Sequence, residues 1–498
     1  MAKSIMIQGT MSNAGKSLIA AGLCRLFTQD GYNVSPFKSQ NMALNSYITE
    51  AGLEMGRAQV VQAEACKKKP HVWMNPVLLK PTSDMGSQVI VLGKVQGNMC
   101  AMDYYKKKTD YIPVIKEAYD NLAAQSDIVV IEGAGSPAEI NLKENDIVNM
   151  GLAKMVDAPV LLAGDIDRGG VFAQLLGTLE LLEADERSRI KGLIVNKFRG
   201  DAAILEPGIQ MLEQRCKKKV LGIVPYLDVD IEEEDSLAKE LEKRNVTAAV
   251  DIAVIKLRKI SNFTDFHALS IDEGVSVRYV EKPSELGNPH MIILPGSKNT
   301  VADMKWLRES GLEALILRHA GKGTLIFGIC GGFQLLGRRI VDEAGVEGGG
   351  EIRGLGLLPV TTYFEEGKTQ RCREGKTIGL SGPFAPLSYK QVKGYEIHMG
   401  KTVYHEEKPE YFLETDDGFD GCMKGNVAGT YFHGIFDQED FRKALLSLLY
   451  ERCGLGKYNK EILSFRAYKE QQYDRLADAL RESMDMKEIY RIIGVSKC

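Results

Sequence analysis

Two residues of types that together could cleave an amide, Cys330 and His433, lie about a hundred positions apart in this chain. A cysteine thiolate attacks a carbonyl carbon, and a histidine can take the thiol proton and later return it to a leaving ammonia. Each residue alone is more often structural, Cys330 as a buried cysteine and His433 as a packed histidine. Their occurrence together, with His433 one of only seven histidines and framed by glycine, favours catalysis.

The segment TLIFGICGGFQLLG, residues 324–337, predicts the elements that position Cys330. Its apolar residues 325–327 predict a buried strand, and a helix is expected from near Phe333. Cys330 lies on the expected turn between this strand and this helix. A side chain there points out of the sheet and lies at a helix N-terminus, where free N–H groups favour a thiolate and an oxyanion. We expect Gly328, Gly331 and Gly332 to permit the sharp turn and a close approach of substrate.

A second strand-end loop belongs to the same expected site. The apolar stretch Met291–Leu294 predicts a strand, and Pro295, Gly296 and Ser297 follow it. Backbone N–H groups in such a loop, at the carboxyl end of a strand, are suited to an oxyanion hole.

A glycine-rich loop near the N-terminus indicates phosphate binding. Residues 9–17, GTMSNAGKS, lie between an expected strand, 4–8, and an expected apolar helix, 18–27. In that arrangement backbone N–H groups surround phosphates, Lys16 neutralises their charge and the Ser17 hydroxyl joins a magnesium shell. The spacing departs from GxxxxGK[ST], because Gly9 lies one residue too far from Gly15. We still favour nucleotide binding over a chance turn.

Polar side chains follow later strands of the same domain. The apolar run 127–132 ends in Glu132, which we expect to be a second magnesium ligand; an exposed strand-end carboxylate is the alternative. The next expected strand, 159–164, leads into Asp165 and Arg168, which with two glycines indicate a polar site.

Further candidates come from a strand end and two polar loops. Asn196 ends the expected strand 192–197 and is either an adenine contact or a strand-end cap. The loops 38–42 and 139–146 lie at the expected ligand edge, and we expect Gln40, Asn41 and Asp146 to hold an acid substrate or a metal.

Composition limits the class of protein. A chain of 498 residues is too long for one hydrophobic core, so two or three domains are expected. The net charge of −4 gives no electrostatic case for nucleic acid or an anionic membrane. Nine cysteines without CxxC or zinc-like spacing indicate a reducing compartment. Because no signal peptide or membrane-spanning run is recognisable, we expect a cytoplasmic protein.

The pattern of strands and helices predicts an α/β protein of two main domains. Residues 1–235 read as a P-loop-type parallel-sheet domain, and an acidic segment, 228–244, is the expected linker. Residues 250–448 form a second α/β pattern of flavodoxin-like type, and 449–498 a helical, polar extension that is most simply a packing appendage.

The Cys330 segment, the LPGS loop and GTYFHG around His433 closely resemble class I glutamine amidotransferases. The resemblance implies that glutamine is hydrolysed through a Cys330 thioester, with His433 as base and then acid. It also implies that the N–H groups of Gly296 and Gly331 hold the oxyanion. The chain departs from the family where a glutamate usually orients the histidine, because Ile435 stands there. We expect a backbone carbonyl to orient His433 instead.

The loop GTxSxxGKS resembles the dethiobiotin-synthetase group of ATP enzymes that form amides and ureas. Together with GDIDRGGVFA at 164–173 and GYEIHMG at 394–400, it resembles the cobyric acid synthase family of cobalamin biosynthesis. Glu396 and His398 of the last motif are candidates for substrate or domain contacts. The residues expected to bind ATP are Thr10, Asn13, Ala14, Gly15, Lys16, Ser17 and Asn196.

This resemblance implies ATP and Mg²⁺ as cofactors, and glutamine and a corrinoid as small-molecule substrates. It implies that the b, d, e and g carboxylates of (adenosyl)cobyrinic acid a,c-diamide are phosphorylated by ATP and then converted to amides by ammonia. We expect neither a nucleic acid nor a membrane as a partner, and the oligomeric state, a homo-oligomer included, stays open.

Two other functions compete with this interpretation. The first is the sister enzyme, cobyrinic acid a,c-diamide synthase, which GYEIHMG and the short N-terminus argue against. The second is a ParA-like partition or scaffold ATPase with an inactive amidotransferase-like domain. The Cys330 and His433 pair and the lack of a basic surface disfavour it.

Overall fold

The structure is a computed structural model that describes residues 2–82, 86–232, 248–347 and 349–495. The chain forms two compact units, neither continuous in sequence. The first unit comprises Met1–Ala43, Met55–Glu232 and Tyr468–Cys498, and the second comprises Leu44–Glu54 and Glu233–Ala467. The domain boundaries expected from the sequence stay a prediction. Residues 233–247, which include most of the expected linker, lie outside the described residues.

A six-stranded sheet forms the centre of the first unit, and each of its strand pairs is parallel. Near-continuous apolar runs make these strands, as expected where helices cover both faces of a sheet. Across the sheet the order is β12 (Val220–Pro225), β11 (Ile190–Phe198), β10 (Val160–Asp165), β1 (Lys3–Gly9), β9 (Ile128–Glu132) and β2 (Val34–Phe37).

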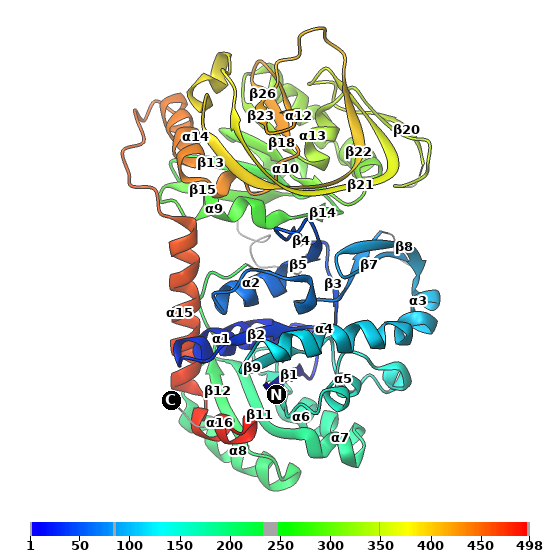
Figure 1. The fold of residues 1–498 in the computed structure, drawn as a ribbon. Coiled ribbons are helices and arrows are strands. Elements are labelled where there is room, and N and C mark those ends of the chain that lie inside the picture. The colour runs from blue at the N-terminus through cyan, green and yellow to red at the C-terminus, as the bar shows by residue number, and fades with distance from the viewer. Residues whose placement is uncertain (1, 83–85, 233–247, 348, 496–498) are drawn as a thin grey trace. The chain divides into compact units, whose positions relative to one another are not determined.

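Helices and a smaller sheet complete the first unit (Figure 1). The helices are α1 (Lys16–Gln29), α2 (Arg57–Ala65), α3 (Ala101–Lys107), α4 (Ile112–Ala124), α5 (Met150–Met155), α6 (Val171–Leu181), α7 (Ala184–Arg189), α8 (Ala202–Cys216) and α16 (Met486–Ile493). The smaller sheet has the order β3 (Gln40–Met42), β6 (Val77–Pro81), β7 (Gly86–Val91) and β8 (Lys94–Cys100).

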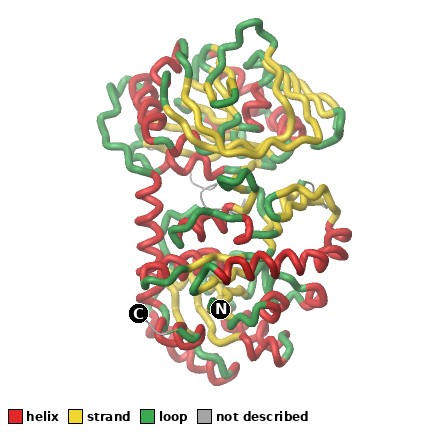
Figure 2. The backbone as a smooth tube through the Cα atoms, in the orientation of Figure 1, coloured by secondary structure: helices red, strands yellow, loops and turns green. Residues whose placement is uncertain are grey.

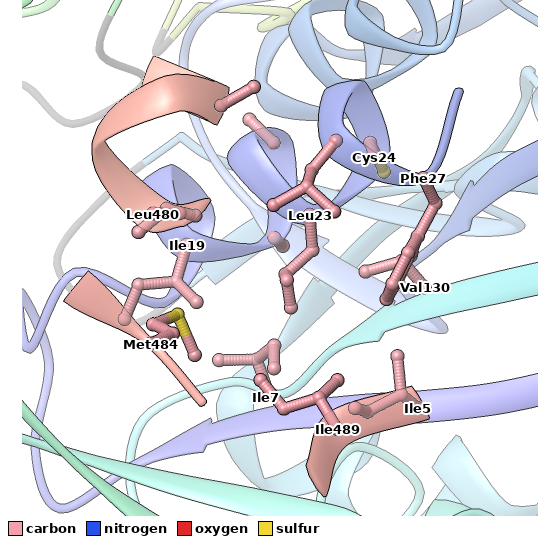
Figure 3. Packing of buried hydrophobic residues seen from close by; sticks show 14 of the residues in the cluster. Ile5, Ile7, Ile19, Leu23, Cys24, Phe27, Val130, Leu480, Met484 and Ile489 are labelled. Atoms are coloured by element: carbon pink, nitrogen blue, oxygen red, sulfur yellow. The ribbon is translucent and has the colours of Figure 1, made fainter. Parts of the chain in front are cut away.

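The C-terminal helices contribute to the hydrophobic core of the first unit. Leu480 of α15 (Phe465–Ser483) and Ile489 of α16 are fully buried in one cluster with Ile5 of β1 and Leu23 of α1. Figure 3 shows side chains from α1, β1 and the two C-terminal helices gathered in this cluster. Because Gly22 of α1 has no side chain, Leu480 can lie against the helix, where an added Cβ would be 2.4 Å from Leu480 Cδ1.

The second unit also has a six-stranded central sheet. Its order is β15 (Val275–Val280), β13 (Val250–Ile255), β16 (Met291–Leu294), β18 (Leu325–Ile329), β26 (Val427–Thr430) and β25 (Cys422–Lys424). The first five strands are parallel and follow the order 2-1-3-4-5 in the chain, which is flavodoxin-like; β25 is antiparallel. The α/β fold class expected for both domains is confirmed.

A second sheet in this unit is built on two long antiparallel strands, visible as extended yellow strands in Figure 2. Its strands are β20 (Gly350–Arg353), β19 (Arg339–Asp342), β21 (Val360–Thr377), β23 (Leu413–Thr415) and β24 (Gly418–Asp420), with β22 (Gln391–Tyr404) paired to β21. Two short strands, β14 (Ile260–Ser261) and β17 (Gly296–Ser297), also pair.

The helices of the second unit are α9 (His267–Ser270), α10 (Pro283–Leu286), α11 (Thr300–Ser310), α12 (Leu312–Gly321), α13 (Gly331–Leu336) and α14 (Glu439–Arg452). Strand β4 (Ser46–Ile48) and the first residue of β5 (Glu54–Gly56) also belong to this unit. Among the described residues of the whole chain, no helix is both long and apolar enough to cross a membrane.

Candidate active sites

Cys330 lies between the buried strand β18 and α13, as the sequence predicts, and the helix begins at Gly331 rather than near Phe333. The cysteine has φ 52° and ψ −109°, so a residue with a Cβ adopts a positive φ at the turn. Such strain is found preferentially at active sites. The Cys330 Sγ is buried and lies 3.5 Å from the carbonyl oxygen of Ile397, on β22.

The glycines beside Cys330 serve close packing rather than the turn itself. We expected Gly328, Gly331 and Gly332 to permit the sharp turn, but the positive φ at the turn belongs to Cys330, and the three glycines lack it. A Cβ on Gly332 would lie 1.9 Å from the carbonyl oxygen of Leu294, and one on Gly331 would lie 2.7 Å from the backbone nitrogen of Ser297. The absence of side chains here brings α13 directly against the end of β16 and the loop after it.

His433 follows β26, the strand that pairs with β18, so parallel neighbours carry the two candidate residues to one edge of the sheet (Figure 1). The imidazole is buried, and its Nε2 has no hydrogen-bond partner among the described residues. Burial alone would lower the pKa of His433, but the Asp265 carboxylate and the Cys330 sulfur raise it to about 10. The imidazole next to Cys330 is therefore disposed to carry a proton at neutral pH.

Asp265 is the group that orients His433, and it corrects our expectation of a backbone carbonyl. The Nδ1–H of His433 donates to Asp265 Oδ2 at 2.7 Å, and the N–H of Gly434 donates to Oδ1 at 3.1 Å. Asp265 is buried and lies in a 3-10 turn, η5 (Phe263–Phe266). Asp265 thus supplies His433 with the orienting carboxylate that a nucleophile–base pair requires, and Cys330 lies near enough to raise the pKa of His433.

The sequence carries no local signal for Asp265, because it lies 168 residues before His433 and in a different element. The family pattern places the orienting glutamate two residues after the histidine. Ile435 at that position shows that this carboxylate is missing, and it does not indicate which residue replaces it. The two residues meet because η5 and the turn after β26 pack against each other.

The two expected oxyanion donors lie on facing elements, one in the short strand β17 and one at the start of α13. Gly296 belongs to the short strand β17, and a Cβ there would be 3.4 Å from the Cε1 atom of His433. Gly331 is the first residue of α13 and abuts Ser297. Both glycines therefore lie beside the candidate pair Cys330 and His433, and their role as oxyanion donors remains a prediction.

The GYEIHMG motif lies on β22, next to the same site. Glu396 is buried and accepts hydrogen bonds from Arg371 Nε at 2.8 Å and from Arg373 Nη1 at 2.5 Å. The His398 ring stacks on Tyr431 at 3.7 Å, and burial lowers the pKa of His398 to about 4. His398 is therefore neutral near pH 7, unlike His433.

The glycine-rich loop follows β1 and ends at α1, where the sequence places it. Asn13 and Gly15 have positive φ values of 60° and 92°. Lys16 is buried, and its Nζ donates to the carbonyl oxygens of Met11 and Gly135 at 3.0 and 3.1 Å. Burial lowers the pKa of Lys16 to about 8. The loop is therefore formed, with its lysine folded back on it.

Glu132 is the centre of a buried polar cluster next to the loop. Its Oε1 accepts from Ser17 Oγ at 2.7 Å and from Lys38 Nζ at 2.8 Å, and its Oε2 accepts from Gln62 at 2.5 Å. Burial would raise the pKa of Glu132, but Lys38 and the two other donors lower it overall. The sequence singled out Ser17 and Glu132, whereas Lys38 and Gln62 were not assigned to this cluster.

The donor set at Ser17 and Glu132 fits Mg²⁺. A hydroxyl and an ionised carboxylate supply hard oxygen ligands, and the cation Lys38 already lies at the carboxylate oxygen that Ser17 contacts. Among the described residues, no group of three or more His, Cys, Asp or Glu side chains forms a metal cage. Such a sparse set is typical of Mg²⁺ that takes further ligands from phosphates and water.

Residues near the glycine-rich loop support it from the neighbouring strands. The Asn196 side chain donates to the carbonyl oxygen of Ala14 at 2.8 Å, and a Cβ on Gly15 would lie 2.0 Å from its Nδ2. Thr10 Oγ1 donates to Gln174 at 3.1 Å. The structure therefore shows Asn196 bracing the loop, and its contact with adenine remains a prediction.

Asp165 reaches the loop indirectly. Its Oδ2 accepts from Lys197 Nζ at 2.7 Å, and the same Nζ donates to the carbonyl oxygen of Asn13 at 2.6 Å. Arg168 is more distant, with its Nε 4.0 Å from Asp165 Oδ2. Both lie at the carboxyl end of β10, as expected, and a substrate role for them is still a prediction.

The remaining substrate candidates have partners within the first unit. Gln40 accepts from the Tyr104 hydroxyl at 2.6 Å, and Asn41 donates to Gln59 at 2.9 Å. Asp146 Oδ1 accepts from the N–H groups of Val148 and Asn149, and Oδ2 accepts from that of Gly151, which caps the start of α5. This capping gives Asp146 a structural role, and a role toward a metal or substrate remains a prediction.

Two family models match the chain. A CobQ/CobB/MinD/ParA nucleotide binding domain matches residues 5–238, and a CobB/CobQ-like glutamine amidotransferase domain matches residues 251–441. The chain is 57% identical to a cobyric acid synthase of Ruminiclostridium cellulolyticum over 99% of this chain and 97% of that protein. It is 56% identical to one of Lachnoclostridium phytofermentans and 51% identical to one of Streptococcus sanguinis, each over 99% of both chains.

Proposed function

The chain belongs to the cobyric acid synthase family, and we propose that it makes (adenosyl)cobyric acid by amidation of (adenosyl)cobyrinic acid a,c-diamide. The acceptor groups are the b, d, e and g carboxylates, the nitrogen comes from glutamine, and ATP activates each carboxylate. The single observation that carries the glutamine-dependent half is the buried set of Cys330, His433 and Asp265.

In the glutaminase reaction, the Cys330 sulfur attacks the side-chain amide carbon of glutamine and a carbon–sulfur bond forms. The carbon–nitrogen bond breaks, and His433 donates its proton to the leaving ammonia. Asp265 holds the imidazole with Nε2 available and stabilises its charged form. Water then hydrolyses the thioester to glutamate, while His433 takes a proton from the water and the sulfur leaves. Gly296 and Gly331 are the proposed donors to the oxyanion.

In the synthetase reaction, a corrinoid carboxylate oxygen attacks the γ-phosphorus of ATP and ADP leaves. Ammonia then attacks the acyl phosphate, an amide forms and inorganic phosphate is released. Lys16 and the backbone of the glycine-rich loop would hold the phosphates. Magnesium would be held by Ser17 and Glu132, and when bound it supplies charge neutralisation on the phosphates. Lys38 would then move from the carboxylate oxygen that it contacts in the structure.

The competing functions fit the chain less well. Relatives at 51–57% identity over nearly the whole chain are named cobyric acid synthases, which supports the b, d, e and g carboxylates over those of the sister enzyme. A ParA-like ATPase with an inactive second domain would not need a buried His433–Asp265 pair next to a strained cysteine.

The test is release of glutamate from glutamine by the protein and by Cys330→Ser. We expect the wild type to release glutamate and the variant to release none above background. Cys453→Ser is a matched control, because Cys453 is a free cysteine at the end of α14 in the same unit. Equal glutamate release by the Cys330 variant and the wild type would contradict the proposed nucleophile.

A further inference from the structure

The second unit contains a short segment, Leu44–Glu54, that is separated in sequence from the rest of this unit. The chain leaves the first unit at Ala43 and returns to it at Met55. Ser46 and Ile48 are buried within the second unit, and so is the Glu54 carboxylate. The segment is therefore an internal part of the amidotransferase unit that lies outside the matched residues 251–441.

Asn45 and Ser46 join the loop that carries Asp265 through a reciprocal pair of hydrogen bonds. The N–H of Ser46 donates to Asn262 Oδ1 at 3.0 Å, and the N–H of Phe263 donates to Asn45 Oδ1 at 3.3 Å. Asn262 has φ 52° and its carbonyl oxygen accepts from the N–H of Asp265 at 3.1 Å. Asn262 thus fixes the backbone of Ser46, and Asn45 fixes the backbone of Phe263. Asn262 and Phe263 lie three and two residues before Asp265, whose carboxylate holds His433.

The same segment contacts Tyr395, whose ring lies on the face of the His433 imidazole. The Tyr395 ring stacks on His433 at 5.1 Å, and the two backbones exchange hydrogen bonds at 2.9 and 3.2 Å. The Tyr395 hydroxyl donates to the carbonyl oxygen of Ser46 at 3.2 Å, and the Tyr47 ring packs edge-on against Tyr395 at 5.3 Å. Ile48 lies in the same small apolar cluster.

The far end of the segment is anchored to strand β21. The buried Glu54 carboxylate accepts from Lys368 Nζ at 2.5 Å and from Gln370 Nε2 at 2.7 Å. The Cys372 Sγ lies 3.3 Å from the carbonyl oxygen of Ile48. Contacts at both ends therefore hold residues 44–54 in one place, between η5 and the long strands.

We propose that residues 44–54 are a positioning segment of the glutaminase site, and that the Asn45–Asn262 pair keeps Asp265 in place to hold His433. The segment contacts the two supports of the imidazole, the Asp265 loop on its edge and Tyr395 on its face. Asn45 and Asn262 act through Asp265 and do not touch the reacting atoms. This inference rests on the proposed function, because it assigns a role within the same hydrolytic site.

The physical consequence is a change in the proton affinity of His433. Asp265 helps raise the pKa of His433, and a displaced Asp265 would lower it. Since the imidazole must be protonated to release ammonia, a lower pKa shifts the basic limb of the pH–rate profile to lower pH. A residue that only stabilises the fold would reduce the amount of active enzyme without moving this limb.

The experiment compares Asn262→Gly, Asn262→Asp and wild type in glutamate release. Glycine tolerates the positive φ and removes the acceptor, whereas aspartate keeps an oxygen acceptor for the N–H of Ser46. We expect Asn262→Gly to lower kcat on the order of 10²-fold, with a smaller change in KM and a basic limb at lower pH. Asn262→Asp should keep most of the activity and the wild-type limb. In both variants the amidation with ammonium chloride should match the wild type.

A matched control is Asn426→Ala, which also removes side-chain hydrogen bonds to backbone in the second unit. Asn426 bonds to Ala320 and Thr324, away from Asp265 and His433. This variant should leave the pH–rate profile in place.

The following outcomes would overturn the inference. One is a pH–rate profile and kcat in Asn262→Gly equal to those of wild type. Another is an equal loss in Asn262→Gly and Asn262→Asp without a shift of the basic limb, which would indicate a structural role only. If the wild type itself releases no glutamate, the proposed function fails, and the result is thereby distinguished from failure of the positioning role.

Discussion

At the scale of single residues, His433 uses its two nitrogens for two tasks. Nδ1 is bonded to Asp265, which leaves Nε2 as the nitrogen available to the substrate and to Cys330. The buried carboxylate and the sulfur offset the cost of a charged imidazole in an apolar environment. In the proposed mechanism the charge of the imidazole therefore depends on Asp265, which contacts Nδ1 and leaves Nε2 to the reaction.

Replacing Asp265 by asparagine should reduce glutamate release strongly. We expect a loss of kcat on the order of 10²–10⁴-fold, because the neutral amide neither fixes the tautomer nor stabilises the imidazolium. The pKa of His433 is raised from 6.5 to about 10, so the protonated form is lost only as the pH rises through that value. In the variant the basic limb of kcat should move toward lower pH. An unchanged limb in a pH series would show that Asp265 does not set the charge of His433.

Lys16 gives a separate prediction for nucleotide binding. Burial lowers its pKa to about 8, so in the free enzyme its charge is lost as the pH rises through that value. ATP should therefore bind more weakly at about pH 9 than at about pH 7. Titration calorimetry with wild type and Lys16→Met tests this, since the advantage of the wild type should shrink with rising pH. A constant ratio of the two dissociation constants would contradict a charge-based role.

At the scale of elements, the sequence predicts six strands of the two central sheets to within a few residues, because buried parallel strands read as apolar runs. These strands are β1, β9, β10, β11, β16 and β18. The strand expected at Met291–Leu294 is β16 without any change of bounds. The segment around Cys330 is likewise a strand, turn and helix. The residue that makes the sharp turn differs from the ones expected. Cys330 has the positive φ, whereas its glycine neighbours allow close packing.

The parts that the sequence could not predict depend on contacts between distant segments. Asp265 and residues 44–54 carry no motif, and they reach His433 only through tertiary packing. The carboxylate of Asp146 in a polar loop predicts a ligand role, and the loop composition does not predict the backbone partners that the structure shows. Local patterns identify a candidate residue type, whereas its partners are set by topology.

The C-terminal helix α15 gives a prediction at this scale. Leu480 is fully buried in the core of the first unit, so Leu480→Ala should destabilise that unit by about 2–5 kcal/mol. Ile204→Ala is the matched control, because Ile204 is 82% exposed and its truncation should change stability by less than about 0.5 kcal/mol. Stability is measured from thermal unfolding of the first unit, whose transition is identified because ATP raises its midpoint temperature. Equal shifts in the two variants would show that α15 does not stabilise the first unit.

At the scale of the whole molecule, one chain combines a phosphate-binding unit with a glutamine-hydrolysing unit. The two chemistries are separable in principle, because ammonia supplied from solution can replace ammonia made from glutamine. Loss of Cys330 should therefore remove only the glutamine-dependent reaction, and loss of Lys16 should remove amidation with either nitrogen source.

The most direct test of this account is mass spectrometry of cobyrinic acid a,c-diamide after incubation with the protein, ATP, magnesium and a nitrogen source. We predict that wild type converts the b, d, e and g carboxylates to amides with glutamine or ammonium chloride. Cys330→Ala should do so with ammonium chloride alone. A corrinoid of unchanged mass in the wild-type reaction would contradict the proposed substrate, and amidation by the variant with glutamine would contradict the role of Cys330.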